Sequence, residues 1–159
     1  MSNAIDLVDK LAYVLVTGAS KGIGRTMAIE TSRNLKAGSV VVLLARSLEG
    51  LEGTKAAILS AAKNDLKVLV KPMDLTKPPV DEINELIRSS FDAALTFDLA
   101  LIIHNVGTLG DIGKWAKDIT DFDELNSYFD VNVNTPAILN NCLLKVIPAA
   151  TKKVIVNIT

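Results

Sequence analysis

A cluster of glycines near the start of the chain has the spacing of an anion-binding turn. The segment Thr17–Gly24 reads Thr-Gly-Ala-Ser-Lys-Gly-Ile-Gly and lies between an apolar run and a helix-like one. Glycines permit a tight turn and a close approach of the backbone to a pyrophosphate, whose charge then lies at the helix N-terminus. The spacing Gly-x-x-x-Gly-x-Gly is one residue looser than the dinucleotide fingerprint. The segment therefore predicts a nucleotide site, with a tight turn that binds no ligand as the alternative. The residues expected to bind the cofactor here are Gly18, Ser20, Lys21, Gly22, Ile23 and Gly24.

The charge pattern after the second apolar run indicates which nucleotide fits. Proteins that bind NAD place an acid near the end of the second strand, where it bonds the ribose 2′-hydroxyl. Here that run ends Leu-Leu-Ala-Arg-Ser at residues 43–47, with no acid at its tip. Arg46 offers a forked set of donors and Lys21 a point charge, so the two could flank a 2′-phosphate. The sequence favours NADPH over NADH, with two solvated surface cations as the alternative.

The elements that must position these residues alternate strictly along the chain. Short, largely β-branched or leucine runs are typical of strands buried on both faces, as in a parallel sheet. They are Tyr13–Thr17, Val40–Ala45, Val68–Val70, Leu99–Ile103 and Val154–Ile158. Helix-like spacing of apolar residues follows the first four of them, at Ile23–Leu35, Leu48–Ala62, Val80–Ser90 and Phe122–Val146. This alternation predicts an α/β fold with a doubly wound parallel sheet, the Rossmann fold. The long non-periodic segment Asn105–Thr120 follows the fourth strand and is the candidate for contacting substrate.

Composition limits the class of protein and its partners. The 159 residues fit a single domain, and a mean hydropathy of +0.33 is that of a globular chain. A formal charge of −1 excludes a strong field for nucleic acid or for an anionic membrane, and we expect no metal. No apolar run reaches the roughly 18 residues that span a bilayer, and the N-terminus lacks the basic start of a secretory signal. The single Cys142 cannot form an internal disulfide, so we expect a cytoplasmic protein.

From Tyr13 to Thr159 the sequence resembles the short-chain dehydrogenase/reductase family, whose glycine motif is Thr-Gly-x-x-x-Gly-x-Gly. The resemblance implies that Asp74 and Leu75 contact the adenine ring, although Asp74 could instead cap a turn. The segment His104–Gly107 stands where the family has Asn-Asn-Ala-Gly. Asn105 and Gly107 are retained there and are expected beside the cofactor. His104 and Val106 depart from the pattern, and a solitary histidine is more often a structural hydrogen-bonding residue than a catalyst.

A narrower resemblance is to the sepiapterin reductases, a branch of that family. Residues 107–114, Gly-Thr-Leu-Gly-Asp-Ile-Gly-Lys, are similar to the Gly-Ser-Leu-Gly-Asp stretch of that branch, and residues 43–46 and 153–159 also fit it. The resemblance implies reduction of a pterin side-chain ketone, as in tetrahydrobiopterin biosynthesis, with Leu109 helping to line the pterin pocket. Another carbonyl substrate is the alternative.

Asn132 aligns with the asparagine of the family's catalytic tetrad, whose backbone carbonyl holds a water molecule. A physical feature supports this placement, because Pro136 lacks an N–H and leaves the carbonyl four residues earlier in a helix without its partner. A kinked helix with polar faces is the alternative.

The family's catalytic serine, tyrosine and lysine are expected beyond Thr159. The resemblance therefore implies that residues 1–159 are an NADP-binding Rossmann domain, incomplete at its C-terminus and ending after the fifth strand. Such a chain is the cofactor-binding half of an NADPH-dependent reductase. The alternative is a truncated, non-catalytic form that binds nucleotide or dimerises. The family commonly forms homodimers through the helix that corresponds to Phe122–Val146.

Overall fold

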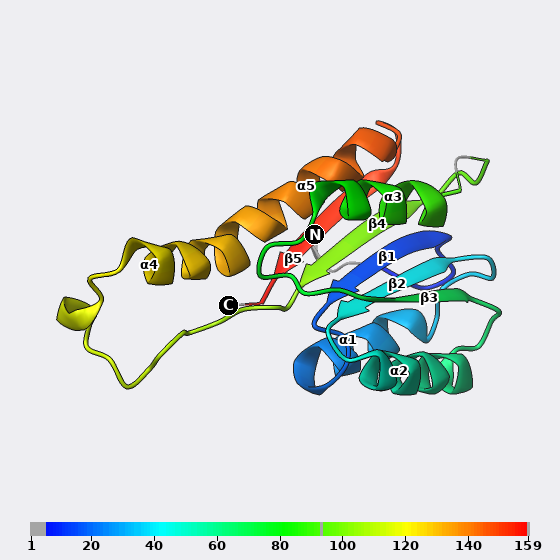
Figure 1. Ribbon diagram of the computed structural model, residues 1–159. Helices are drawn as coiled ribbons and strands as arrows, with labels where there is room; N and C mark the ends of the chain where they lie inside the picture. Colours follow the sequence, from blue (N-terminus) through cyan, green and yellow to red (C-terminus); the bar gives the residue numbers. More distant parts are fainter. Residues whose placement is uncertain (1–5, 93, 159) are drawn as a thin grey trace.

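The computed structural model describes residues 6–92 and 94–158 and shows a five-stranded parallel sheet between two layers of helices (Figure 1). The strands are β1 (Ala12–Thr17), β2 (Val40–Ala45), β3 (Lys67–Pro72), β4 (Leu99–His104) and β5 (Lys152–Asn157). They are ordered β3-β2-β1-β4-β5, and each neighbouring pair is parallel. The predicted doubly wound α/β fold is confirmed. Thr159, where the expected catalytic segment would begin, lies outside the described residues.

The alternation of side chains along the central strands explains why helices cover both faces. Every residue of β1, β2 and β4 is buried. The helices are α1 (Gly22–Ser32), α2 (Leu48–Ala61), α3 (Val80–Ser90), α4 (Phe122–Phe129) and α5 (Thr135–Val146). Tyr13 and Leu15 of β1 belong to the core formed with α3 and α5, whereas Val14 and Val16 belong to the core formed with α1 and α2. Strands of this kind must be apolar at every position, which is why they are recognisable as continuous runs.

The helix expected over Phe122–Val146 is interrupted by one π-helical turn. Between α4 and α5, residues Asp130–Asn134 form this π-turn, and the N–H of Thr135 bonds to the carbonyl of Asp130, five residues earlier. Pro136 explains the change, because it has no N–H to continue the α-helical pattern. A π-turn within a continuous helical path therefore stands where a kinked helix was the alternative. None of the helices in the described part of the chain is long and apolar enough to cross a membrane.

The loop after β4 and helix α4 project beyond the edge of the sheet (Figure 1). The loop contains a short 3₁₀ turn at Ala116–Asp118, and none of the eight residues of α4 is buried. Its apolar side chains include Phe122, which is 81% exposed. This part of the molecule lies next to the carboxyl ends of the strands, where an open α/β sheet binds its ligands.

Candidate cofactor-binding cleft

A cleft of about 1190 Å³ lies where β1, β2, β3 and β4 end. All the residues predicted to bind the cofactor line it except Gly24, which is buried beneath the glycine loop. They are Gly18, Ser20, Lys21, Gly22, Ile23, Arg46, Asp74, Leu75, Asn105 and Gly107. The sheet order brings these four separate segments together at the point where the strand order reverses.

The glycine loop has the geometry that an anion site requires. Gly18 and Gly22 have φ angles of +67° and +57°, which other residues adopt only with strain. A Cβ on Gly24 would lie 2.4 Å from the carbonyl oxygen of Gly18, so only glycine fits there. Lys21 is the N-cap residue of α1, and its side chain makes no capping hydrogen bond. The first N–H groups of α1 therefore remain available to an anion in the cleft. The glycine loop and this helix end fit a dinucleotide pyrophosphate.

Two residues of α2 support the glycine loop from below. The hydroxyl of Thr54 donates to the carbonyl of Ala19 at 2.8 Å. A Cβ on Gly50 would lie 2.8 Å from the Cβ of Ser20, so the helix approaches the loop closely at this glycine. Neither support was predicted, and the only signal for them in the sequence is Gly50, an unexplained glycine in the first turn of α2.

Charged side chains of both signs line the part of the cleft next to β2. Lys21 and Arg46 are placed there as expected, and Arg25 and Glu49 line the same cleft. Glu49 lies in the first turn of α2, beyond the tip of β2 itself. With Asp74 included, the cleft holds three cationic and two anionic side chains. Neither Arg25 nor Glu49 was predicted, although Arg25 directly follows the glycine motif and Glu49 stands three residues after Arg46.

Asp74 caps a turn at the border of the cleft, and its contact with an adenine ring stays a prediction. One carboxylate oxygen accepts hydrogen bonds from the N–H and the hydroxyl of Thr76, at 2.9 and 2.8 Å. These bonds lower the pKa of the Asp74 carboxyl below its ordinary value, and the nearby charge of Arg46 lowers it further. Asp74 thus caps the turn after β3, and its carboxylate lines the cleft in the ionised form.

Thr17 joins the end of β1 to the turn after β4. Its hydroxyl oxygen accepts hydrogen bonds from the N–H groups of Asn105 and Val106, at 2.9 and 3.2 Å. The same hydroxyl donates to the carbonyl of Ile103 at 3.5 Å. The backbone of Asn105 and Val106 is therefore held against the end of β1.

His104 is buried, with 4% of its surface exposed, and lies outside the cleft lining. Its Nε2 and the side-chain oxygen of Asn140 are 2.8 Å apart, which joins β4 to α5. Burial lowers the pKa of His104, so the ring is neutral near pH 7. The histidine thus has the structural hydrogen-bonding role that a solitary histidine favours.

Asn132 uses its side chain to hold the loop after β4. Its amide oxygen accepts from the N–H of Thr108 at 3.0 Å, and its amide nitrogen donates to the carbonyl of Thr108 at 2.9 Å. The π-turn also changes the basis for the water site proposed at its carbonyl. Continued by one residue, this five-residue spacing would bring the carbonyl of Val131, rather than that of Asn132, opposite Pro136. The water site at Asn132 stays a prediction.

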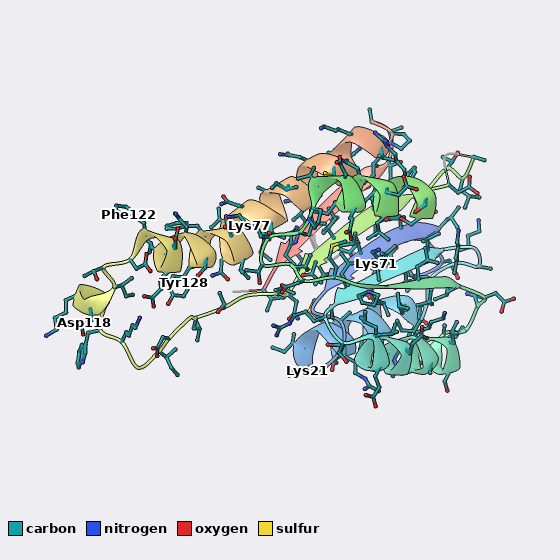
Figure 2. All side chains as sticks on the ribbon, in the orientation of Figure 1. Lys21, Lys71, Lys77, Asp118, Phe122 and Tyr128 are labelled. Carbon is teal, nitrogen blue, oxygen red and sulfur yellow. The ribbon has the colours of Figure 1, made fainter. Side chains whose placement is uncertain are left out.

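Two further contacts hold the same loop to α4. The hydroxyl of Tyr128 accepts from the N–H of Asp111 at 3.2 Å, and Lys114 forms an ion pair with Glu124 at 2.8 Å. Figure 2 shows Tyr128 between α4 and the loop, with Phe122 on the opposite side of the helix. Leu109, expected in a substrate pocket, lies on this loop, is 86% exposed and does not line the cleft.

Comparison with known sequences identifies relatives that share this arrangement. The family model described as short chain dehydrogenase matches residues 12–159. Sepiapterin reductase of Mus musculus is 32% identical over 151 residues, which cover 93% of this chain and 57% of that protein. Sepiapterin reductase of Xenopus laevis is 31% identical over 148 residues, which cover 91% of this chain and 55% of that protein. The chain therefore spans somewhat more than half the length of these relatives.

Solved structures give the same result. A short chain dehydrogenase from Escherichia coli CFT073 in complex with NADPH superposes with a TM-score of 0.70 at 27% identity, over 94% of this chain and 59% of that one. The short chain dehydrogenase from Shigella flexneri superposes with a TM-score of 0.71 at 26% identity, over 94% of this chain and 55% of that one. With the glycine loop, the parallel sheet and the cleft in the expected places, the chain belongs to the short-chain dehydrogenase family.

Proposed function

We propose that this chain is the cofactor-binding part of an NADPH-dependent carbonyl reductase. The observation that carries the proposal is the pair Lys21 and Arg46 in the cleft beside the tip of β2, where an NAD-binding protein would have an acid. The two cations would hold the 2′-phosphate, and the glycine loop would hold the pyrophosphate. Asp74 and Leu75 would contact the adenine, and the turn at Asn105 and Gly107 would lie beside the nicotinamide. When bound, NADPH supplies a hydride to the carbonyl carbon of the substrate.

For the substrate we propose a pterin side-chain ketone, as in tetrahydrobiopterin biosynthesis. The support is the similarity to sepiapterin reductases, in particular the segment Gly107–Asp111 after β4. Leu109 lies on the projecting loop, and it would reach a bound pterin when that loop closes over the cleft. Another carbonyl compound is the alternative substrate. Measuring NADPH oxidation with each compound in turn distinguishes the two proposals.

The proton that completes a carbonyl reduction requires a donor, which in this family is a tyrosine followed four residues later by a lysine. Neither Tyr13 nor Tyr128 has a lysine at that distance. We propose that the serine, tyrosine and lysine are supplied by chain that follows Thr159 in the working enzyme. Asn132 would contribute a backbone water site to the same centre. The buried Cys142 and the nearly neutral net charge are consistent with a cytoplasmic enzyme.

We also propose that the working protein is a homodimer. Phe122, Leu125, Phe129 and Val133 are all more than 40% exposed and recur every three or four residues along α4 and the π-turn. This spacing places them along one side of the helix, the pattern of a surface that packs against another helix. The same surface supports the alternative of a truncated form that only dimerises or binds nucleotide. Such a form would bind NADPH without oxidising it.

The decisive test of cofactor choice is a charge reversal at Arg46. Arg46→Asp removes a charged hydrogen bond to the 2′-phosphate and adds repulsion, so NADPH should bind about 10- to 100-fold more weakly. NADH, which lacks that phosphate, should change less than about threefold. Arg88→Asp is the matched control, because Arg88 is an exposed cation on α3 outside the cleft. Binding of both nucleotides is measured by fluorescence titration. An equal loss for NADPH and NADH would refute the proposed role of Arg46.

A further inference from the structure

A second, much smaller cavity lies behind the cleft, between the end of β4 and the π-turn. Its volume is about 10 Å³, close to the space that a single water molecule needs. Most of its lining is apolar, including Leu75, Val106 and Leu139. The polar side chains that line it belong to Thr17, His104 and Thr135. A cavity of this size and lining admits one small polar molecule at most. Its polar atoms therefore decide whether it contains a water molecule.

One nitrogen of His104 is the main polar feature of this cavity. The side-chain oxygen of Asn140 can only accept, so Nε2 of His104 carries the ring proton and donates to it. Nδ1 is then an acceptor. Nδ1 is fully buried, and no group in the described residues pairs with it. Burial also lowers the pKa of His104, which keeps Nδ1 unprotonated near neutral pH. Leaving a buried acceptor unpaired is unfavourable, and native proteins rarely do so.

The neighbouring hydroxyl of Thr17 cannot satisfy this nitrogen. A hydroxyl has one donor and two acceptor positions. Thr17 uses both acceptor positions for the N–H groups of Asn105 and Val106, and its proton for the carbonyl of Ile103. Thr17 is therefore excluded as the partner of Nδ1, and no other group of the described residues is hydrogen-bonded to it.

The π-turn places a second acceptor at the same cavity. The N–H of Thr135 donates a hydrogen bond to the carbonyl of Asp130, five residues earlier. In that spacing, the carbonyl of Val131 faces residue 136, and Pro136 has no N–H to offer. Val131 and Pro136 both line the cavity. Nδ1 of His104 is thus an acceptor without a donor among the described residues, and the carbonyl of Val131 is a second acceptor for which Pro136 provides no N–H in that spacing. One water molecule carries two protons.

We infer that this cavity is a binding site for one internal water molecule, which donates to Nδ1 of His104 and to the carbonyl of Val131. The water thus links β4 to the π-turn through two hydrogen bonds, one to each of these acceptors. Val131 also lines the cofactor-binding cleft, so the water fixes the position of one wall of that cleft. The inference does not depend on which nucleotide or substrate the protein uses.

The test uses the fact that His104 is the only histidine in the sequence. A long-range ¹H–¹⁵N correlation spectrum of the ¹⁵N-labelled protein therefore contains one imidazole. We expect the tautomer with the proton on Nε2, and an Nδ1 resonance shifted upfield from that of a bare, unbonded imidazole nitrogen. We also expect a cross-peak between the imidazole Hε1 and a long-lived water. A bare Nδ1 resonance without a water cross-peak, or a proton on Nδ1, overturns the inference.

A pair of proline variants tests the second partner. Pro136→Ala supplies an N–H that competes for the carbonyl of Val131, so the water cross-peak should weaken and the Nδ1 resonance should move toward the bare value. Pro148→Ala is the matched control, because Pro148 follows α5 and lies outside the cavity. It should leave both signals unchanged. Unchanged signals in Pro136→Ala would overturn the role of the Val131 carbonyl.

Discussion

Gly24→Ala should damage the glycine loop by overpacking it. The added methyl group would lie 2.4 Å from the carbonyl oxygen of Gly18 and 2.5 Å from the side-chain nitrogen of Asn105. The amide of Asn105 can move, but the carbonyl of Gly18 is backbone in the turn that lines the cleft. Relief of the contact therefore requires a shift of the loop itself, which distorts the proposed pyrophosphate site.

The size of the effect follows from two opposing contributions. Alanine is favoured over glycine within a helix by about 1 kcal/mol, which stabilises the variant. Overpacking of a rigid site costs about 1–3 kcal/mol or more, and a contact this short with backbone lies toward the upper end. We expect a net loss of about 1–2 kcal/mol. For a chain of this size, that corresponds to a decrease in Tm of about 2–8 °C.

Gly53→Ala is the matched control for this experiment. Gly53 also lies within a helix, α2, but a Cβ there would have nothing within 4 Å. Its stability should rise by up to about 1 kcal/mol from helix propensity alone. Thermal and urea unfolding without nucleotide give the stability of both variants, and a fluorescence titration gives their affinity for NADPH. A Gly24→Ala protein as stable as Gly53→Ala would refute the argument from packing.

Three further changes test other contacts. Asn132→Ala removes both hydrogen bonds to Thr108, so limited proteolysis should cut the loop after β4 faster than in the control Asn134→Ala, which loses only a bond within the helix. Burial raises the pKa of Tyr13 to about 12, so the folded state keeps a proton that the unfolded state loses near pH 10. The free energy of unfolding should thus fall by about 2–3 kcal/mol between pH 10 and 12, and Tyr13→Phe should abolish this slope in urea unfolding. Burial lowers the pKa of His104, so the unfolded state takes up a proton first, and stability should fall as the pH drops below about 6.5. A stability independent of pH in that range would contradict the neutral, buried state of His104.

The central strands could be predicted because they leave a simple pattern. Both faces of β1, β2 and β4 are buried, so each appears in the sequence as an unbroken apolar run. The cleft could be predicted for a related reason. Its lining residues closely follow strands β1 to β4, so sequence position places Gly18, Arg46, Asp74 and Asn105 at the carboxyl ends of these strands.

Contacts between segments far apart in the chain could not be predicted in this way. Thr54 reaches Ala19 across 35 residues, and Asn132 reaches Thr108 across 24. No local pattern encodes either pair, because each depends on how two elements pack after the sheet has formed. The π-turn was missed for a different reason. Pro136 shows that one helical bond is lost, but the choice between a kink and a five-residue spacing depends on packing of the helix against β4.

The contacts that hold the loop after β4 form a nested series. Thr108 pairs with Asn132, Asp111 with Tyr128, and Lys114 with Glu124, at separations of 24, 17 and 10 residues. The first part of segment 108–132 is therefore held to its last part, as the two arms of a hairpin are. These three contacts do not involve the sheet. A segment whose contacts are mainly internal can be replaced as a unit between members of a family. Sequence changes within this segment can then leave the sheet unaltered.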